Sequence, residues 1–367
     1  MMSIPPATPR RLGLIGSYAE ASQPGVYVIE YEEASGKLHI RSTVDGLHNP
    51  TFLDVDAETN CVYSLMEEKT KDGTRYGAAA AFKLNSAEGT LELLNKTATL
   101  PAPTCHIALD RTRRFVVTAS YHGGLVGLSP VLPDGRIGEP LDVKQHTGKS
   151  LLSVQSQGRC HSATFDRGNR FVLVCDLGLD KVISYELDAA AGQLVYKSEV
   201  KLTPGSGPRH FAFHPYLPFA YVINELGSTV TAFAYDEETG TLTEKQTIST
   251  LPGYFVLENA CADIHISPDG RFLYGSNRGH DSLAIFAIDP EKGTLTIVDY
   301  ASVRGAHPRN FALSPDAEAR FVFVANRDTD QVVVFYRAGD TGLLTPAGYA
   351  LDIPKPVCIR FLPDGAE

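Results

Sequence analysis

Short stretches of alternating apolar and polar residues dominate the chain, and they recur in one order: an apolar run, a polar turn and a second apolar run. The clearest copies are HFAFHPYLPFAYVINE at residues 210–225, DIHISPDGRFLYGSNR at 263–278 and NFALSPDAEARFVFVANR at 310–327. Weaker copies begin at residues 51, 106 and 161. The spacing is that of propeller blades, roughly 40–50 residues. No helical period of 3.6 residues persists for more than a few residues, so the pattern predicts an all-β fold.

A recurring glycine marks a second turn in each repeat. It precedes a short apolar run at Gly36, Gly89, Gly135, Gly192, Gly240, Gly293 and Gly342. Glycine supplies the positive φ that tight hairpins need, so each repeat should hold four strands, named A to D in chain order. Four-stranded repeats arranged radially form a propeller, and we predict a seven-bladed β-propeller. The alternative, two β-sandwiches, does not explain seven equal periods.

The two ends of the chain complement each other. PVCIRFLPDG at residues 356–365 resembles an A strand with nothing after it, and RLGLIGSY at residues 11–18 resembles a B strand with no A strand before it. We expect one blade to be built from both ends of the chain, which closes the ring. Residues 1–10 are predicted to be an N-terminal tail and residues 11–367 a single propeller domain.

Polar side chains gather where the meander brings strand ends together. Because A and B strands are antiparallel, the starts of A strands and the ends of B strands lie on the same face of the ring. The starts of A strands carry Arg209, Arg309, His161, His210, Asp263 and Asn310. The ends of B strands carry Glu225, Arg278 and Arg327. We predict that these side chains converge on one end of the central channel, where polar groups need partners or a ligand.

Several arginines around one funnel indicate an anionic substrate, since guanidinium stays charged and can bind carboxylate or phosphate with two hydrogen bonds. The alternative for Arg209 and Glu225 is a structural ion pair between neighbouring elements, and Arg309 and Arg327 share that alternative. The imidazole of His161 suits general-base catalysis near neutral pH.

Motifs of other enzyme classes are missing. The six cysteines lack CxxC spacing, which favours free thiols over a zinc site or a disulfide framework. No GxSxG nucleophile elbow, P-loop or strand-to-helix GxGxxG is present. We therefore expect neither a metal nor a cofactor.

The composition argues against two classes of binding partner, nucleic acids and membranes. The 367 residues carry a formal net charge of -10 without a basic stripe, which argues against nucleic acid. Neither a secretory signal nor an apolar run of about 20 residues is visible, so we expect a cytoplasmic protein with no membrane partner. The oligomeric state stays open. The connection at residues 248–261 lies on the predicted site face and could form a lid.

At these positions the sequence resembles the seven-bladed β-propeller lactonase family, which includes bacterial 6-phosphogluconolactonases and fungal carboxy-cis,cis-muconate cyclases. The most specific segments are GPRHFAFHP (207–215), YVINELGSTV (221–230), ADIHISPDGRFLYGSNR (262–278) and CHS (160–162). The resemblance covers nearly the whole chain. It implies an active-site set of His161, Arg209, Glu225 and Arg278.

The resemblance also implies a reaction, hydrolysis of an anionic sugar lactone, with 6-phosphogluconolactone as the expected substrate. His161 or Glu225 would be the base, while Arg209 and Arg278 would hold the anion or the developing oxyanion. Further substrate contacts are expected from His210, Asp263, Arg309 and Asn310, although His210 could instead hydrogen-bond within the strands. Two other functions stay open: a carboxymuconate-type lactonising cyclase and a non-catalytic binding scaffold.

Overall fold

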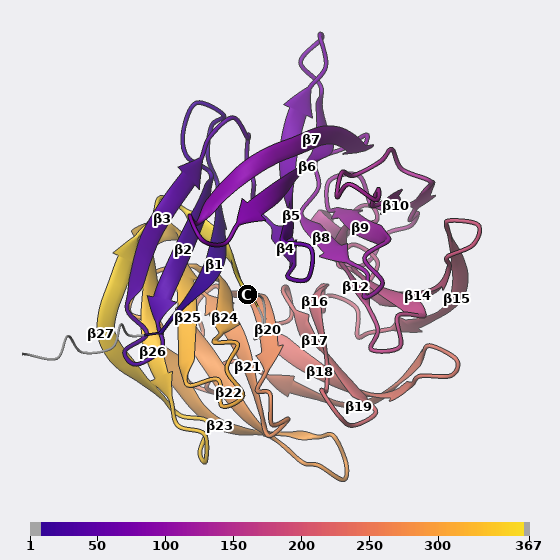
Figure 1. Ribbon diagram of the computed structural model, residues 1–367. Helices are drawn as coiled ribbons and strands as arrows, with labels where there is room; N and C mark the ends of the chain where they lie inside the picture. The colour runs from indigo at the N-terminus through magenta and orange to yellow at the C-terminus, as the bar shows by residue number, and fades with distance from the viewer. Residues whose placement is uncertain (1–8, 363–367) are drawn as a thin grey trace, which may run out of the picture.

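Seven four-stranded antiparallel sheets surround a central channel in the computed structural model, which describes residues 9–362 (Figure 1). The A strand of each sheet lies innermost, against the A strands of the two neighbouring sheets. This arrangement confirms the predicted seven-bladed β-propeller. Two short 3₁₀ helices also occur in the described residues, η1 (Ser153–Gln155) and η2 (Arg327–Thr329).

The blades follow the chain in order, apart from the first. Blade 1 consists of β28 (Pro356–Phe361), β1 (Arg10–Ser17), β2 (Val26–Glu32) and β3 (Leu38–Val44). Blade 2 consists of β4 (Leu53–Asp56), β5 (Cys61–Lys69), β6 (Arg75–Asn85) and β7 (Thr90–Leu100). Blade 3 consists of β8 (His106–Leu109), β9 (Phe115–Ser120), β10 (Leu125–Pro130) and β11 (Asp142–Gln145).

The remaining four blades contain the three clearest sequence repeats. Blade 4 consists of β12 (Cys160–Phe165), β13 (Phe171–Asp176), β14 (Lys181–Asp188) and β15 (Gln193–Lys201). Blade 5 consists of β16 (Pro208–Phe213), β17 (Phe219–Asn224), β18 (Thr229–Asp236) and β19 (Thr241–Ser249). Blade 6 consists of β20 (Ala260–Ile266), β21 (Phe272–Arg278), β22 (Ser282–Ile288) and β23 (Leu295–Ser302). Blade 7 consists of β24 (Pro308–Leu313), β25 (Phe321–Asn326), β26 (Gln331–Arg337) and β27 (Leu344–Asp352).

The ring closes as the chain ends predict. β28 pairs antiparallel with β1, and Ile15 lies opposite Ile359. Both side chains are fully buried in an apolar cluster that includes Phe323 of blade 7. The end of the last repeat, residues 363–365, and most of the predicted tail, residues 1–8, lie outside the described residues. β1 itself begins at Arg10, one residue before the predicted start of the domain.

Glycine turns pack neighbouring blades together. All seven glycines that mark the repeats have φ between 66° and 85°, as the hairpins require. A Cβ on Gly342 of blade 7 would come within 2.5 Å of the ring of Phe272, the first residue of a B strand in blade 6. Gly293 has the same relation to Phe219 of blade 5. Glycine is therefore required both for the turn and for the contact between blades.

Buried asparagines shape the loops that follow three B strands. Asn224, Asn277 and Asn326 are each fully buried. Their side-chain amides donate to Thr229 Oγ1 at 2.9 Å, to the Thr250 carbonyl at 2.8 Å and to the Val303 carbonyl at 3.0 Å, respectively. These bonds hold the backbone at the point where the next residue leaves the strand. The following residues are Glu225, Arg278 and Arg327.

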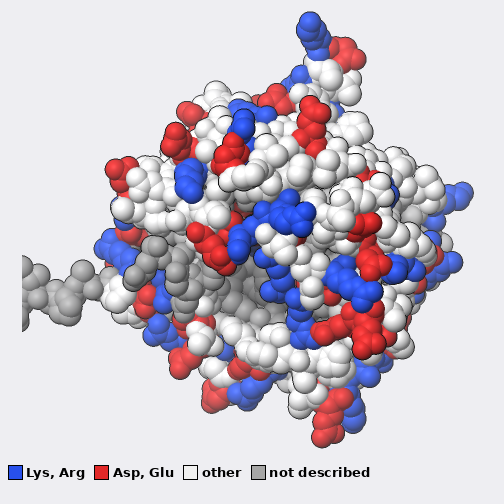
Figure 2. All heavy atoms as spheres, turned by 45° about the vertical axis from the view of Figure 1, so that its right-hand side comes forward, with Lys and Arg blue, Asp and Glu red and all other residues white. Residues whose placement is uncertain are grey.

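Charges are interspersed on the outer surface. On the face that Figure 2 shows, Lys and Arg side chains stand among Asp and Glu side chains over most of the surface, around a central hollow. The described part of the chain has no helix with the length and hydropathy needed to span a bilayer.

Deleting residues 356–367 should cause aggregation or a large loss of stability. The deletion removes β28, which leaves the ladder edge of β1 unpaired and exposes the apolar side chains around Ile15. Thermal and denaturant unfolding would measure the effect. As a control, Ile359→Ala keeps the strand and should cost only about 2–5 kcal/mol. A truncated protein as stable as the full chain would contradict the proposed closure.

Candidate active site

A cavity of about 300 Å³ opens at the end of the channel where the A strands begin. His161, Glu225 and Arg309 line it, although they come from blades 4, 5 and 7. Blades 1 to 3 supply the rest of its lining: Tyr18, Asn49, Thr51, Glu67, Arg75, Pro103, Thr104, Cys105, Tyr121 and His122. Channel geometry thus brings together side chains that are far apart in sequence.

Glu225 joins two arginines at this mouth. Its Oε2 accepts a hydrogen bond from Arg209 Nε at 2.8 Å and forms an ion pair with Arg278 Nη2 at 3.0 Å. Backbone carbonyls complete the support, because Arg209 Nη1 donates to Ala262 at 2.5 Å and Arg278 Nη2 donates to Cys261 at 2.6 Å. Each guanidinium keeps one terminal nitrogen, Nη2 of Arg209 and Nη1 of Arg278, without a hydrogen-bond partner among residues 9–362.

The third arginine is more open. Arg309 lies over the ring of Tyr18, with 5.7 Å from its guanidinium carbon to the ring centre. Within the described residues it makes neither a hydrogen bond nor an ion pair. Arg209, Arg278 and Arg309 therefore surround one carboxylate, Glu225, and the ionised Asp263 adds a second negative charge near Arg209, so the group keeps a net positive charge. This excess charge favours an anion in the cavity.

Burial and charge set the protonation states. Desolvation raises the pKa of Glu225, but the positive charges of Arg278, Arg209 and Arg309 lower it by a larger amount. The net pKa is therefore below its usual value, and the carboxylate is ionised. Desolvation, followed by the charges of Arg309 and Arg278, lowers the pKa of Arg209 to about 9. That guanidinium is still protonated at neutral pH.

His161 is neutral in the same field. Desolvation comes first, and the positive charge of Arg209 next, in holding the pKa of His161 well below its usual value. Its Nδ1 is buried and has no hydrogen-bond partner in the described structure, whereas its Nε2 lies 3.9 Å from Glu225 Oε2. Nε2 is therefore the nitrogen that can meet a bound water. An edge contact with Tyr121, at 5.7 Å between ring centres, supports the ring.

Five of the six predicted substrate contacts lie deeper than expected. Arg209 and Arg278 are buried and do not line the 300 Å³ cavity. His210, Asp263 and Asn310 are buried, and none of them lines the 300 Å³ cavity. Asp263 Oδ1 lies 2.7 Å from His210 Nδ1, while Asp263 Oδ2 accepts from the Asn310 amide. His210 Nε2 lies 3.2 Å from Arg209 Nη1. The trio therefore forms a polar layer beneath Arg209, with its hydrogen-bonding groups turned toward one another.

Two further expectations concern the rim. Arg327 shares a repeat position with Glu225 and Arg278, yet it lies outside the cavity lining and donates from Nε to Asp328 at 2.6 Å. The connection at residues 248–261 contributes no side chain to the cavity either. Its Phe255 packs against the ring of His280, 4.7 Å between centres.

Most of the lining side chains from blades 1 to 3 were not predicted from the sequence. Tyr18 and Tyr121 directly follow the B strands β1 and β9, and Glu67 lies near the end of β5. The rule that predicted Glu225 at the mouth, the end of a B strand, would have found all three. Arg75 begins β6 and pairs with Glu67 at 3.0 Å.

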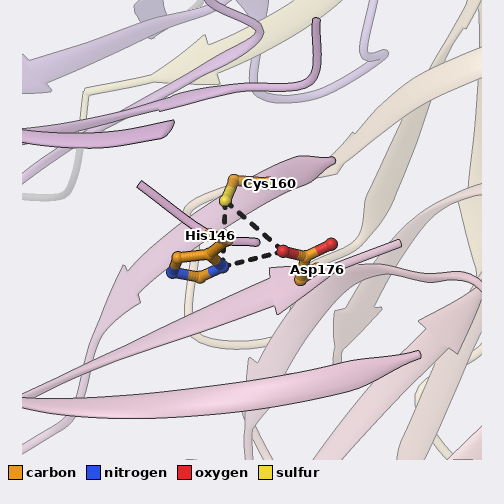
Figure 3. Close-up of side chains that lie close together, drawn as sticks. All are labelled: His146, Cys160 and Asp176. Atoms are coloured by element: carbon orange, nitrogen blue, oxygen red, sulfur yellow. Dashed lines mark hydrogen bonds and ion pairs between the residues drawn. The ribbon is translucent and has the colours of Figure 1, made fainter. Parts of the chain in front are cut away.

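A buried cluster lies beside His161 in blade 4 (Figure 3). In residues 9–362, His146, Cys160 and Asp176 are the group of potential metal ligands whose donor atoms lie within 4.8 Å of one another. Asp176 Oδ2 lies 2.7 Å from His146 Nδ1, which in turn lies 3.2 Å from Cys160 Sγ. The other nitrogen of His146 lies 2.8 Å from the Tyr185 hydroxyl.

This cluster is saturated with hydrogen bonds. Asp176 Oδ1 also accepts the backbone N–H of Arg159 at 2.8 Å. Desolvation, and then Asp176, raise the pKa of Cys160 well above its usual value, so the thiol is protonated. A metal ion would have to displace these protons inside a closed interior. The geometry fits a structural role, in which the cluster anchors the start of β12 next to His161.

Comparison with known proteins gives a consistent result. A family model described as "Lactonase, 7-bladed beta-propeller" matches residues 12–361. A protein of Bacillus subtilis named 6-phosphogluconolactonase is 35% identical over 351 residues, which is 96% of this chain and 98% of the relative. A protein of Formosa agariphila with the same name is 33% identical, over 90% of this chain and 93% of its own length.

A solved structure shares the fold throughout. The periplasmic gluconolactonase of Pseudomonas aeruginosa superposes with a TM-score of 0.89 and 30% identity, and the match covers 96% of this chain and 99% of that one.

Asp176→Ala should destabilise the protein by roughly 2–5 kcal/mol, because it leaves His146 and the Arg159 N–H buried without an acceptor. The matched control Cys160→Ala removes only weak sulfur contacts and should cost less. Denaturant unfolding of the three proteins would compare the two free energies. Equal losses in both variants would contradict a cluster organised around Asp176.

Proposed function

Because this chain belongs to the seven-bladed β-propeller lactonase family, we propose that it hydrolyses 6-phosphogluconolactone to 6-phosphogluconate at the mouth that contains His161. The match over residues 12–361 confirms the family resemblance inferred from the motifs. Lactone hydrolysis follows at the level of the family. The observation that carries the substrate proposal is the net positive charge of the three arginines around Glu225.

His161 is the proposed base. Its Nε2 takes a proton from a water molecule, whose oxygen attacks the lactone carbonyl carbon and forms a tetrahedral oxyanion. The ring C–O bond then breaks, and the proton returns from His161 to the departing ring oxygen, which becomes a hydroxyl group. The second proton of the water molecule stays on the new carboxyl group, which releases it to solvent as the carboxylate forms, and no co-reactant other than water is needed.

Glu225 is less suited to that task. Its Oε2 already forms a hydrogen bond with Arg209 and an ion pair with Arg278, and these positive charges lower its proton affinity. Its proposed role is to hold Arg209 and Arg278 in place, so that their free terminal nitrogens can face the oxyanion. Donors fixed in advance of the reaction stabilise developing charge without reorganising.

Arg309 is the proposed phosphate ligand. It has no internal partner, so its donors do not have to be released before they bind an anion. Arg75 also lines the cavity, paired with Glu67, and could add a second contact by exchanging that partner. His210, Asp263 and Asn310 would support Arg209 from below and touch no substrate.

An unphosphorylated lactone is the second candidate substrate. The Pseudomonas relative is named a gluconolactonase, without a phosphate in its name. The same relative is named as periplasmic, so the cytoplasmic location expected from the sequence stays a prediction. The two substrates differ by one charged group, and this makes Arg309 the residue that separates them.

The acid limb of the profile of kcat/KM against pH should lie below pH 6.5. Only unprotonated His161 can accept a proton, so activity persists above its folded pKa and is lost as pH falls through it; that pKa is lowered. Rates corrected for spontaneous lactone opening would measure the limb. The control is His161→Gln, which should be slow and should lack the acid limb caused by His161. Any limb that remains in this variant comes from titration of the substrate phosphate. A full rate with an unchanged profile in this variant would exclude His161 as the base.

Arg309→Gln should lower kcat/KM for the phosphorylated lactone by roughly tenfold or more, since a hydrogen bond to a charged group contributes about 1.5–3 kcal/mol. The unphosphorylated lactone should lose much less. In the matched variant Arg278→Gln, both substrates should lose similar factors, mainly in kcat. Steady-state kinetics on folded proteins would provide the four ratios. Equal losses for both substrates in Arg309→Gln would refute its assignment to the phosphate.

A further inference from the structure

A second cavity, of about 500 Å³, lies at the opposite end of the channel. The ends of A strands form part of its lining, with Asp54 of β4, Leu109 of β8, Phe165 of β12, Phe213 of β16 and Ile266 of β20. The cavity also reaches inward along the channel to His106, His210 and Asp263. His161, Glu225 and Arg309 do not contribute to it. This cavity is therefore separate from the candidate active site.

An arginine with few partners faces this cavity. Arg360, near the end of β28, donates one hydrogen bond, from Nη1 to the carbonyl of the adjacent Ile359 at 3.2 Å. Residues 9–362 offer its remaining N–H groups no other hydrogen bond and no ion pair. Its guanidinium carbon lies 4.8 Å from the ring centre of Phe52, so the fork lies against an aromatic wall.

The charge of Arg360 is maintained inside the fold. Desolvation lowers its pKa, but Cys358, Asp54 and Asp263 more than offset this, and the net pKa is raised. Asp54 does not satisfy the fork, because its two oxygens accept the backbone N–H groups of Val55 at 3.0 Å and Leu109 at 2.8 Å. Arg360 is only partly buried, and its open donors face the cavity, where a ligand or water can pair with them.

The lining also indicates the kind of anion. Apolar and aromatic side chains, including Phe52, Phe165 and Phe213, form much of the wall. The lining also contains Arg111, so two arginines balance the carboxylates of Asp54 and Asp263 and leave no excess positive charge for a dianion. A ligand with a single negative charge is therefore favoured. A planar guanidinium binds a carboxylate through two parallel hydrogen bonds.

We propose that this cavity is a second binding site, which takes a small monocarboxylate with an apolar body. The carboxylate binds the open side of Arg360, and the body packs against Phe52 and the neighbouring aromatic side chains. The cavity shares no lining residue with the other mouth, but its His210 and Asp263 belong to the layer that supports Arg209.

Calorimetric titration of the full-length protein with benzoate tests the proposal. Benzoate should bind at one site per chain, more tightly than benzyl alcohol, which lacks the charge, and than inorganic phosphate, which lacks the apolar body. Arg360→Lys keeps the charge but loses the fork, and should weaken benzoate binding about tenfold or more. The matched control Arg309→Gln, at the opposite mouth, should leave the affinity unchanged.

Three results would overturn the proposal. These are no benzoate binding by the full chain, full affinity in Arg360→Lys, or loss of affinity in Arg309→Gln, which would place the ligand in the active-site mouth. If Arg360→Lys unfolds, the double variant Arg360→Gln with Asp54→Asn removes both charges together. That folded double variant should also have lost benzoate binding, and retained binding would count against the site.

Discussion

Seven sheets can surround one channel only when the blade at the seam is complete, and the pairing of β28 with β1 completes it. An open ring would leave a ladder edge exposed and would let the blades splay apart. Closure also forces the starts of distant A strands to face one another. Arg209 and Arg309, a hundred positions apart in the chain, meet at one mouth for this reason. The glycine turns, such as Gly342 against Phe272, keep the blades close enough for that meeting.

The resulting mouth carries a net positive charge, and the hydrogen bonds and ion pairs around its arginines explain how the fold tolerates that charge. Glu225 and backbone carbonyls hold Arg209 and Arg278, while the layer of His210, Asp263 and Asn310 lies beneath them. Burying several charges of one sign is unfavourable for folding, so this arrangement does not by itself stabilise the protein. The same arrangement is useful for catalysis, because fixed donors wait for charge that arrives with the substrate. A bound anion would repay part of the cost.

Much of this architecture could be predicted from the sequence, because repetition makes position informative. The phase of HFAFHPYLPFAYVINE and its relatives located Arg209, Glu225 and Arg278 at one mouth, and the two incomplete ends predicted the shared blade. The position of a residue in the repeat does not, however, predict how deeply its side chain is buried. His210 occupies a predicted mouth position, yet its ring turns toward Asp263, and Arg209, one position earlier, is buried as well.

Other features escaped the sequence for different physical reasons. Tyr18 and Tyr121 follow B strands in weakly repeated blades, where the motif is hard to align. His146 belongs to a loop with no repeat position, and only tertiary packing brings it to Cys160 and Asp176. The unpaired donors of Arg360 could not be predicted, because they depend on the tertiary contact between the end of β28 and Phe52.

The central claim is that an anionic sugar acid binds at the mouth of His161 with its phosphate on Arg309. A crystal structure with 6-phosphogluconate, the product, tests it most directly. The account predicts phosphate oxygens within hydrogen-bond distance of the Arg309 guanidinium, and the carboxylate of the product near His161 Nε2 and the free nitrogens of Arg209 and Arg278. Product bound at the opposite end of the channel, or at this mouth with its phosphate away from Arg309, would contradict it.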